Sequence, residues 1–172
     1  MNLMNVEPSW AWAPYEPSLE SPWNLSAAAH LFRRAGFGAN RQELEDALKL
    51  SPSEVVADLV RAEETSDFQT EMQSLLRAAL ATGNVRQLAA QWAYRMLHTP
   101  APLLEKMTLF WHGHFATSAV KVNDVRLMQT QNTLLRRHAL GNFKELAIEI
   151  SRDPAMLLYL DSATNRKSHP NE

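Results

Sequence analysis

Helix-start signals recur along this chain of 172 residues, and they limit its fold more than any other feature. The clearest is Ser51-Pro52-Ser53-Glu54, in which the serine can cap the first turn and the proline suits the first helical position. Apolar residues follow it at helical spacing, as they do after the other signals. Those other signals are Asn40 with Glu43, Ser66 with Gln69, and Asp153 before Pro154.

These signals predict an all-α domain of about seven to nine helices, packed irregularly and not as a simple four-helix bundle. The chain has only five glycines and is 45% hydrophobic, which supports a helical domain with a real core. One long helix is expected over residues 119–140. We expect the domain to cover residues 24–172 and to be the N-terminal part of a longer protein.

Residues 1–23 differ from the rest, because they hold four prolines among several aromatic residues. Proline prevents a regular helix here, so an extended arm is predicted. Its aromatic side chains either cover an apolar patch on the domain itself or anchor the arm on a partner protein. These side chains are Trp10, Trp12, Tyr15 and Trp23.

Composition excludes several classes of site. The chain has no cysteine, so disulfides, thiolate metal sites and a cysteine nucleophile are absent. A net charge of −2 gives no overall attraction to nucleic acid, and no nucleic-acid partner is expected. No apolar stretch is long enough to span a bilayer, and the first 22 residues do not read as a signal peptide. We therefore expect a cytoplasmic protein for the chain as written.

Glu105, His112 and His114 form the best candidate metal site, since histidine and carboxylate bind Zn, Fe or Mn where cysteine is absent. Glu105 and His112 would share one helix face. His114 lies about 200° around a continuous helix from His112, so both imidazoles meet one metal only if the helix ends near Gly113. The alternative is a pair of helix-end histidines that pack beside Trp111.

Two pairs of adjacent arginines are candidates for anion binding, because a guanidinium can hold a phosphate or carboxylate through two hydrogen bonds. The pairs are Arg33 with Arg34 and Arg136 with Arg137. Alternatively, these arginines pair with carboxylates such as those of Glu145, Asp153 or Asp161.

Acid–base groups near such a site would come from His138, which adjoins the second arginine pair, or from Asp161. Asp161 belongs to a polar segment with Asn165 and His169, and such segments often carry function. The alternative for this segment is ordinary turn chemistry.

Several motifs in fixed order give the chain a family resemblance. They are 29–38 (AHLFRRAGFG), 105–116 (EKMTLFWHGHFA), 134–143 (LLRRHALGNF), 153–157 (DPAML), 159–161 (YLD) with Asn165, and 170–172 (PNE). Together they resemble the N-terminal part of the bacterial DUF1800 family, from about Leu25 onward. The resemblance implies a longer protein, often exported, often encoded beside a second family with sulfatase-like or phosphatase-like features. It supplies no established catalytic residues.

Two functions stay open at this point. The first is a helical structural or protein-interaction module, whose partner is a protein encoded nearby. The second is a metal-assisted hydrolase that acts on an anionic phosphate or sulfate ester, with metal-bound water as the nucleophile.

Overall fold

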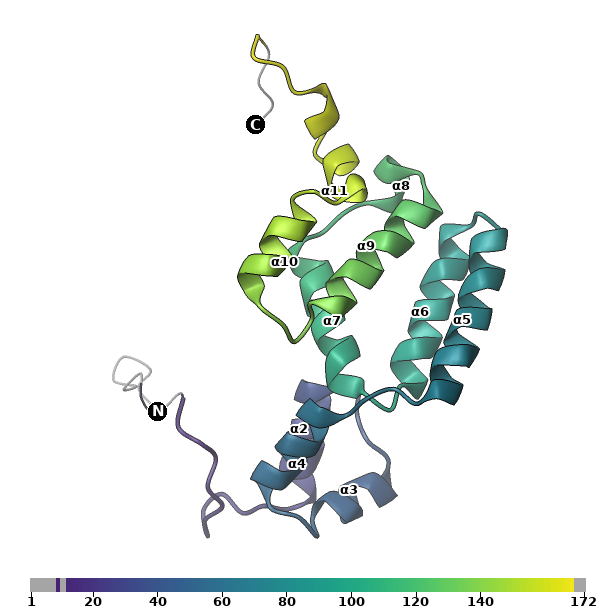
Figure 1. Cartoon of the computed structure of the whole chain (residues 1–172). Helices are drawn as coiled ribbons and strands as arrows, with labels where there is room; N and C mark the ends of the chain where they lie inside the picture. The colour runs from purple at the N-terminus through teal and green to yellow at the C-terminus, as the bar shows by residue number, and fades with distance from the viewer. Residues whose placement is uncertain (1–8, 10–11, 169–172) are drawn as a thin grey trace.

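A computed structural model describes residue 9 and residues 12–168, and this part of the chain is helical without any β-strand (Figure 1). It contains ten α-helices, eight of them with seven or more residues, so the all-α prediction is confirmed. They are α2 (Leu25–Ala35), α3 (Arg41–Ala47), α4 (Pro52–Arg61), α5 (Ser66–Ala81), α6 (Val85–His98), α7 (Pro102–His114), α8 (Ala119–Val122), α9 (Val125–Arg137), α10 (Phe143–Ile150) and α11 (Pro154–Tyr159), with a 3₁₀ turn, η2, at Ser162–Thr164.

Short polar side chains begin these helices as the sequence predicts. Ser51 and Glu54 form a reciprocal capping box at α4, and Asn40 and Glu43 form another at α3. Each box satisfies backbone N–H groups that lack a partner in the first turn. Asp153 caps α11 by accepting a hydrogen bond from the backbone N–H of Met156 at 2.9 Å.

The prediction of one long helix over residues 119–140 is wrong. Asn123 has a φ of 50°, in the left-handed region, and ends the short helix α8. Asp124 then accepts hydrogen bonds from the backbone N–H groups of Arg126 and Leu127 and starts α9 in a new direction. Asparagine and aspartate favour these roles, because their short side chains bond to nearby backbone groups.

An apolar cluster holds the N-terminal helices together. It consists of Ala47, Val55 and Leu59, which join α3 to α4, and it packs against side chains of α2. A second centre, around Leu135, Leu146 and Ile150, joins α9 to α10.

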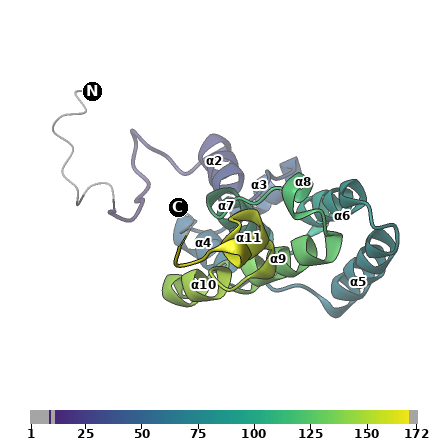
Figure 2. The same cartoon turned by 90° about the horizontal axis from the view of Figure 1, so that it is seen from above.

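Helix α7 connects these two centres, because it contacts α2 and α4 as well as α9. Helices α5 and α6 pair beside α9, and Figure 2 shows this pair on the opposite side of α9 from α10. The arrangement places α6, α7 and α9 side by side, and these three helices position the site described below.

Residues 12–23 of the N-terminal arm contain no regular helix. Trp23 packs against the apolar cluster and donates its indole N–H to the carbonyl oxygen of Leu50 at 3.1 Å. Trp12, by contrast, is 87% exposed. Trp10, His169 and residues 170–172 lie outside the described residues. Among the helices described, none is both long enough and apolar enough to cross a bilayer.

Candidate functional site

A buried carboxylate lies where α6, α7 and α9 meet. Glu105 of α7 is 0% exposed, and its Oε1 accepts hydrogen bonds from Arg95 Nε at 2.8 Å and Arg136 Nε at 2.5 Å. Its Oε2 accepts from Trp92 Nε1 at 2.8 Å and from the terminal guanidinium nitrogen of Arg136 at 3.1 Å. Arg95 also pairs with Glu64, in the segment between α4 and α5. Glu64, Arg95, Glu105 and Arg136 together form what we call the charged hub.

The hub keeps Glu105 ionised despite its burial. Burial by itself raises the pKa of the carboxyl group. The hydrogen bonds and charge of Arg136, the indole of Trp92 and the charge of Arg95 outweigh burial, and the net pKa lies below the ordinary value. Two carboxylates face two guanidiniums in the hub, so its formal charges balance.

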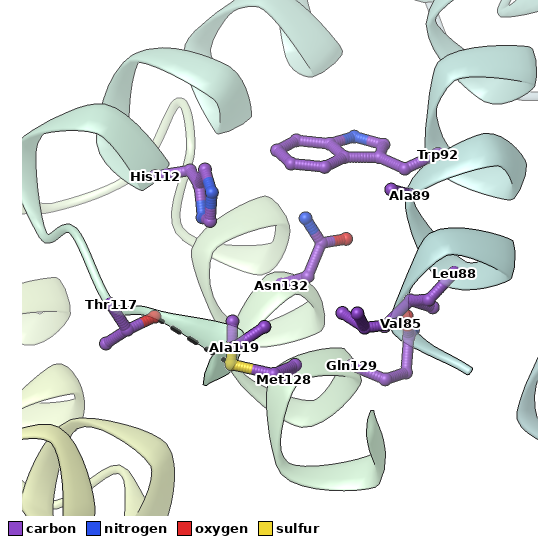
Figure 3. A pocket seen from close by; sticks show the side chains of 10 residues that line it. All are labelled: Val85, Leu88, Ala89, Trp92, His112, Thr117, Ala119, Met128, Gln129 and Asn132. Atoms are coloured by element: carbon purple, nitrogen blue, oxygen red, sulfur yellow. Dashed lines mark hydrogen bonds between the residues drawn. The ribbon is translucent and has the colours of Figure 1, made fainter. Parts of the chain in front are cut away.

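His112 lies seven residues beyond Glu105 on α7, about two helical turns further along, and lines a cavity between α6, α7 and α9. Its ring meets that of Trp92 edge to face, with the ring centres 5.1 Å apart. Burial lowers the pKa of His112, which favours the neutral imidazole near pH 7. Figure 3 shows both rings at one end of the cavity, with the amide nitrogen of Asn132 facing them.

His114 belongs to a different environment. It is exposed and packs among the rings of Phe110, Trp111 and Phe115, at centre-to-centre distances of 4.8 to 6.3 Å. Phe143 of α10 stacks on Trp111 at 5.6 Å. Phe110, Trp111, His114, Phe115 and Phe143 form what we call the aromatic face.

The three candidate metal ligands are not brought together. Helix α7 continues through Gly113 to His114, so the break that the metal site requires does not occur before His114. Glu105 is held by the hub, His112 lines the cavity, and His114 joins the aromatic face. Within residues 9 and 12–168, no three His, Asp or Glu side chains are grouped so as to hold a metal ion. The metal site stays a prediction without geometric support.

The two arginines of the second pair point in different directions, whereas those of the first pair are both exposed. Arg136 turns inward to Glu105, whereas its neighbour Arg137 pairs with Glu149 at the surface. Arg33 and Arg34 are exposed at the end of α2. Carboxylates thus neutralise the second pair, with partners other than those expected from the sequence.

His138 and Asp161 have separate partners. Nε2 of His138 lies 3.3 Å from both Arg137 Nε and Glu149 Oε2. Asp161 pairs with Lys121 at 2.5 Å and adopts a positive φ of 55° before η2. Neither contact joins these residues to His112 or to the hub, so their acid–base roles stay predictions.

Sequence reasoning missed Arg95 and Glu64 as partners of Glu105, and Asn132 as a wall of the cavity. One local signal existed, since Asn132 and Arg136 are four residues apart on α9 and share a hydrogen bond of 2.7 Å. Nothing local marks Glu64, because it lies 31 residues before Arg95 in the sequence.

A family model described as "Protein of unknown function (DUF1800)" matches residues 30–172. The match covers most of the chain, and this protein belongs to the DUF1800 family. No curated protein and no solved structure matches the chain.

Proposed function

We propose that this protein is a helical structural module that binds another protein, and that the aromatic face is its contact surface. The observation that carries the proposal is the exposure of stacked rings. Phe110 is 54% exposed and Phe143 is 55% exposed, although both lie against the half-buried Trp111. Aromatic side chains with exposed rings on a rigid support are typical anchors of protein interfaces.

The rigid support comes from the packing beneath these rings. Trp111 donates its indole N–H to the carbonyl oxygen of Ala139 at 3.0 Å, which fixes the ring between α7 and the turn that follows α9. Trp111 and Phe115 also pack against the centre formed by Leu135, Leu146 and Ile150. A contact surface that is held in place before binding loses little conformational entropy when a partner arrives.

The charged side chains support this proposal because they already form ion pairs with one another within the domain. The hub uses Glu105, Arg95 and Arg136 to join three helices, and Arg137 is paired at the surface. These side chains are therefore committed to the structure of the domain. The partner that we propose is a protein encoded nearby, with an apolar segment that covers Phe110 and Phe143.

Site-specific photocrosslinking in the native cell tests the proposal. A photoreactive phenylalanine replaces Phe110 in one strain and Leu97, which is 75% exposed on α6, in the matched control. We expect one protein adduct at position 110 and none at position 97. Adding Phe143→Ser should remove that adduct, and should weaken binding of the purified, identified partner about tenfold or more.

Two results would overturn the proposed contact surface. One is an adduct pattern that is the same at positions 110 and 97. The other is an adduct at position 110 that persists unchanged with Phe143→Ser. If the purified chain sediments as a dimer and Phe143→Ser abolishes that dimer, the partner is a second copy of this chain and not another protein.

A further inference from the structure

The cavity between α6, α7 and α9 has a volume of about 220 Å³ and mostly apolar walls. Val85, Leu88 and Ala89 line it from α6, and Met128 lines it from α9. An engineered apolar cavity of about 150 Å³ is known to bind benzene, so a single substituted ring fits a volume of this size. The cavity is separate from the aromatic face, which lies on the side of α7 that meets α10.

His112, Thr117, Gln129 and Asn132 are the polar residues that line this cavity, and Asn132 is the one with a buried polar atom that has no partner in the part of the chain that the structure describes. Its Oδ1 accepts a hydrogen bond from Arg136 at 2.7 Å. Because a guanidinium can only donate, this bond fixes which end of the amide is oxygen. Nδ2 therefore points away from Arg136, toward the space between His112 and Trp92, as Figure 3 shows. Nδ2 is buried and has no hydrogen-bond partner among the described residues.

The amide N–H of Asn132 has no partner within the described ranges, so a ligand that supplies a hydrogen-bond acceptor is favoured there. A buried donor without a partner is costly, and a bound acceptor removes that cost. His112 lines the same cavity as Asn132, and its ring meets that of Trp92 edge to face. Because Nδ2 is buried, a ligand in the cavity reaches it only when a neighbouring side chain, such as that of His112, turns aside.

The charges around the cavity decide between a neutral and an anionic ligand. Arg95 and Arg136 are the two cations of the hub, and both are already paired with Glu105. With Glu64 included, two positive and two negative charges balance. No uncompensated cation of the hub is left to offset the desolvation of a carboxylate or phosphate, so an uncharged acceptor is favoured.

We infer that this cavity binds a small, neutral aromatic molecule that carries a carbonyl oxygen. The ring lies against the apolar wall formed by Leu88 and Met128, and the oxygen accepts a hydrogen bond from Asn132 Nδ2. This binding site is independent of the contact surface proposed above, so each stands or falls by its own experiment.

Acetophenone is a suitable probe, because α-methylstyrene has the same shape with a methylene group in place of the oxygen. Titrations of the full chain followed by NMR would monitor the side-chain amide signal of Asn132 and the indole N–H of Trp92. We expect saturable shifts with a Kd on the order of 1 mM for acetophenone. We expect binding about tenfold weaker for α-methylstyrene and for benzoate.

Two pairs of variants sharpen the test. Ala89→Phe places a ring at the exposed mouth of the cavity, whereas Ala90→Phe places the same ring on the next residue of α6, outside the cavity lining. Ala89→Phe should abolish binding of acetophenone, and Ala90→Phe should leave it unchanged. Asn132→Asp keeps an acceptor for Arg136 but removes the Nδ2 donor. It should weaken the binding of acetophenone about tenfold.

Three results would overturn the inference. The first is no saturable shift with acetophenone up to its solubility limit. The second is equal affinity for acetophenone and α-methylstyrene, which would show that Asn132 does not recognise the oxygen. The third is equal affinity of the Ala89→Phe and Ala90→Phe variants, which would place any binding elsewhere.

Discussion

The apolar cluster of α3 and α4 and the charged hub of α6, α7 and α9 stabilise two regions of this protein by opposite means. In the cluster, Ala47, Val55 and Leu59 gain stability simply by leaving water. In the hub, Glu105 is buried with its charge, and only the full set of donors compensates for its desolvation. The cluster should therefore tolerate change by degrees, whereas the hub should fail when a single member is lost.

The largest effect should come from Arg136→Met. The substitution leaves Glu105 with fewer donors and lowers the free energy of unfolding by about 3–5 kcal/mol. Arg137→Met is the matched control, because Arg137 is the next residue but has a side chain that is 63% exposed. Its loss should cost no more than about 1 kcal/mol. Urea denaturation measures both, and equal effects would contradict the special role of the hub.

A smaller effect is expected in the apolar cluster from Leu59→Ala. Removing a buried leucine side chain lowers the free energy of unfolding by about 2–3 kcal/mol, since the surroundings relax only in part. Val60→Ala provides the control, as Val60 follows directly and is 55% exposed. Its cost should stay below about 0.5 kcal/mol. A cost of Leu59→Ala above that of Arg136→Met would reverse the comparison of the two regions.

The two regions should also differ in their response to pH. The folded protein lowers the pKa of Glu105 below its ordinary value of 4.5. The resulting stability is fully present above the pKa of the unfolded chain, and is lost as the pH falls through the pKa of the folded protein. Urea denaturation at several acidic pH values should show a smaller loss in Glu105→Gln than in the parent. Leu59→Ala should retain the loss seen in the parent.

The smallest effect concerns the arm at the edge of the apolar cluster. Trp23→Phe removes the hydrogen bond to the carbonyl oxygen of Leu50 and should cost about 1 kcal/mol. Trp12→Phe is the control, because Trp12 is 87% exposed and should contribute little. Thermal unfolding of both variants checks this. Equal melting temperatures of the two variants would mean that Trp23 does not hold the arm against the domain.

The sequence predicted the helices well, because their signals are local. Ser51 and Glu54 lie three residues apart, and the capping box that they form depends on little else. The break at Asn123 escaped prediction because the apolar pattern continues through it. An asparagine in the left-handed conformation cannot be told from a helical asparagine without the packing around it.

The site was harder to predict because its contacts are distant in sequence. Glu105 was predicted from the sequence as a metal ligand beside His112 and His114, and that role stays a prediction. Its observed partners are Arg95 and Arg136, the second of them 31 residues away, and no periodicity links these positions. The bond between Asn132 and Arg136 is local to α9, but the burial of Asn132 Nδ2 without a partner depends on the packing of α6 and α7 against α9.

The most direct test of the central claim, that Glu105 serves the fold, is urea denaturation of the parent and Glu105→Gln, each with EDTA and with added zinc. We predict that the variant unfolds at a free energy about 3–5 kcal/mol lower, and that neither addition changes the parent. Equal stability of parent and variant in EDTA, with zinc stabilising only the parent, would contradict this account and make Glu105 a metal ligand.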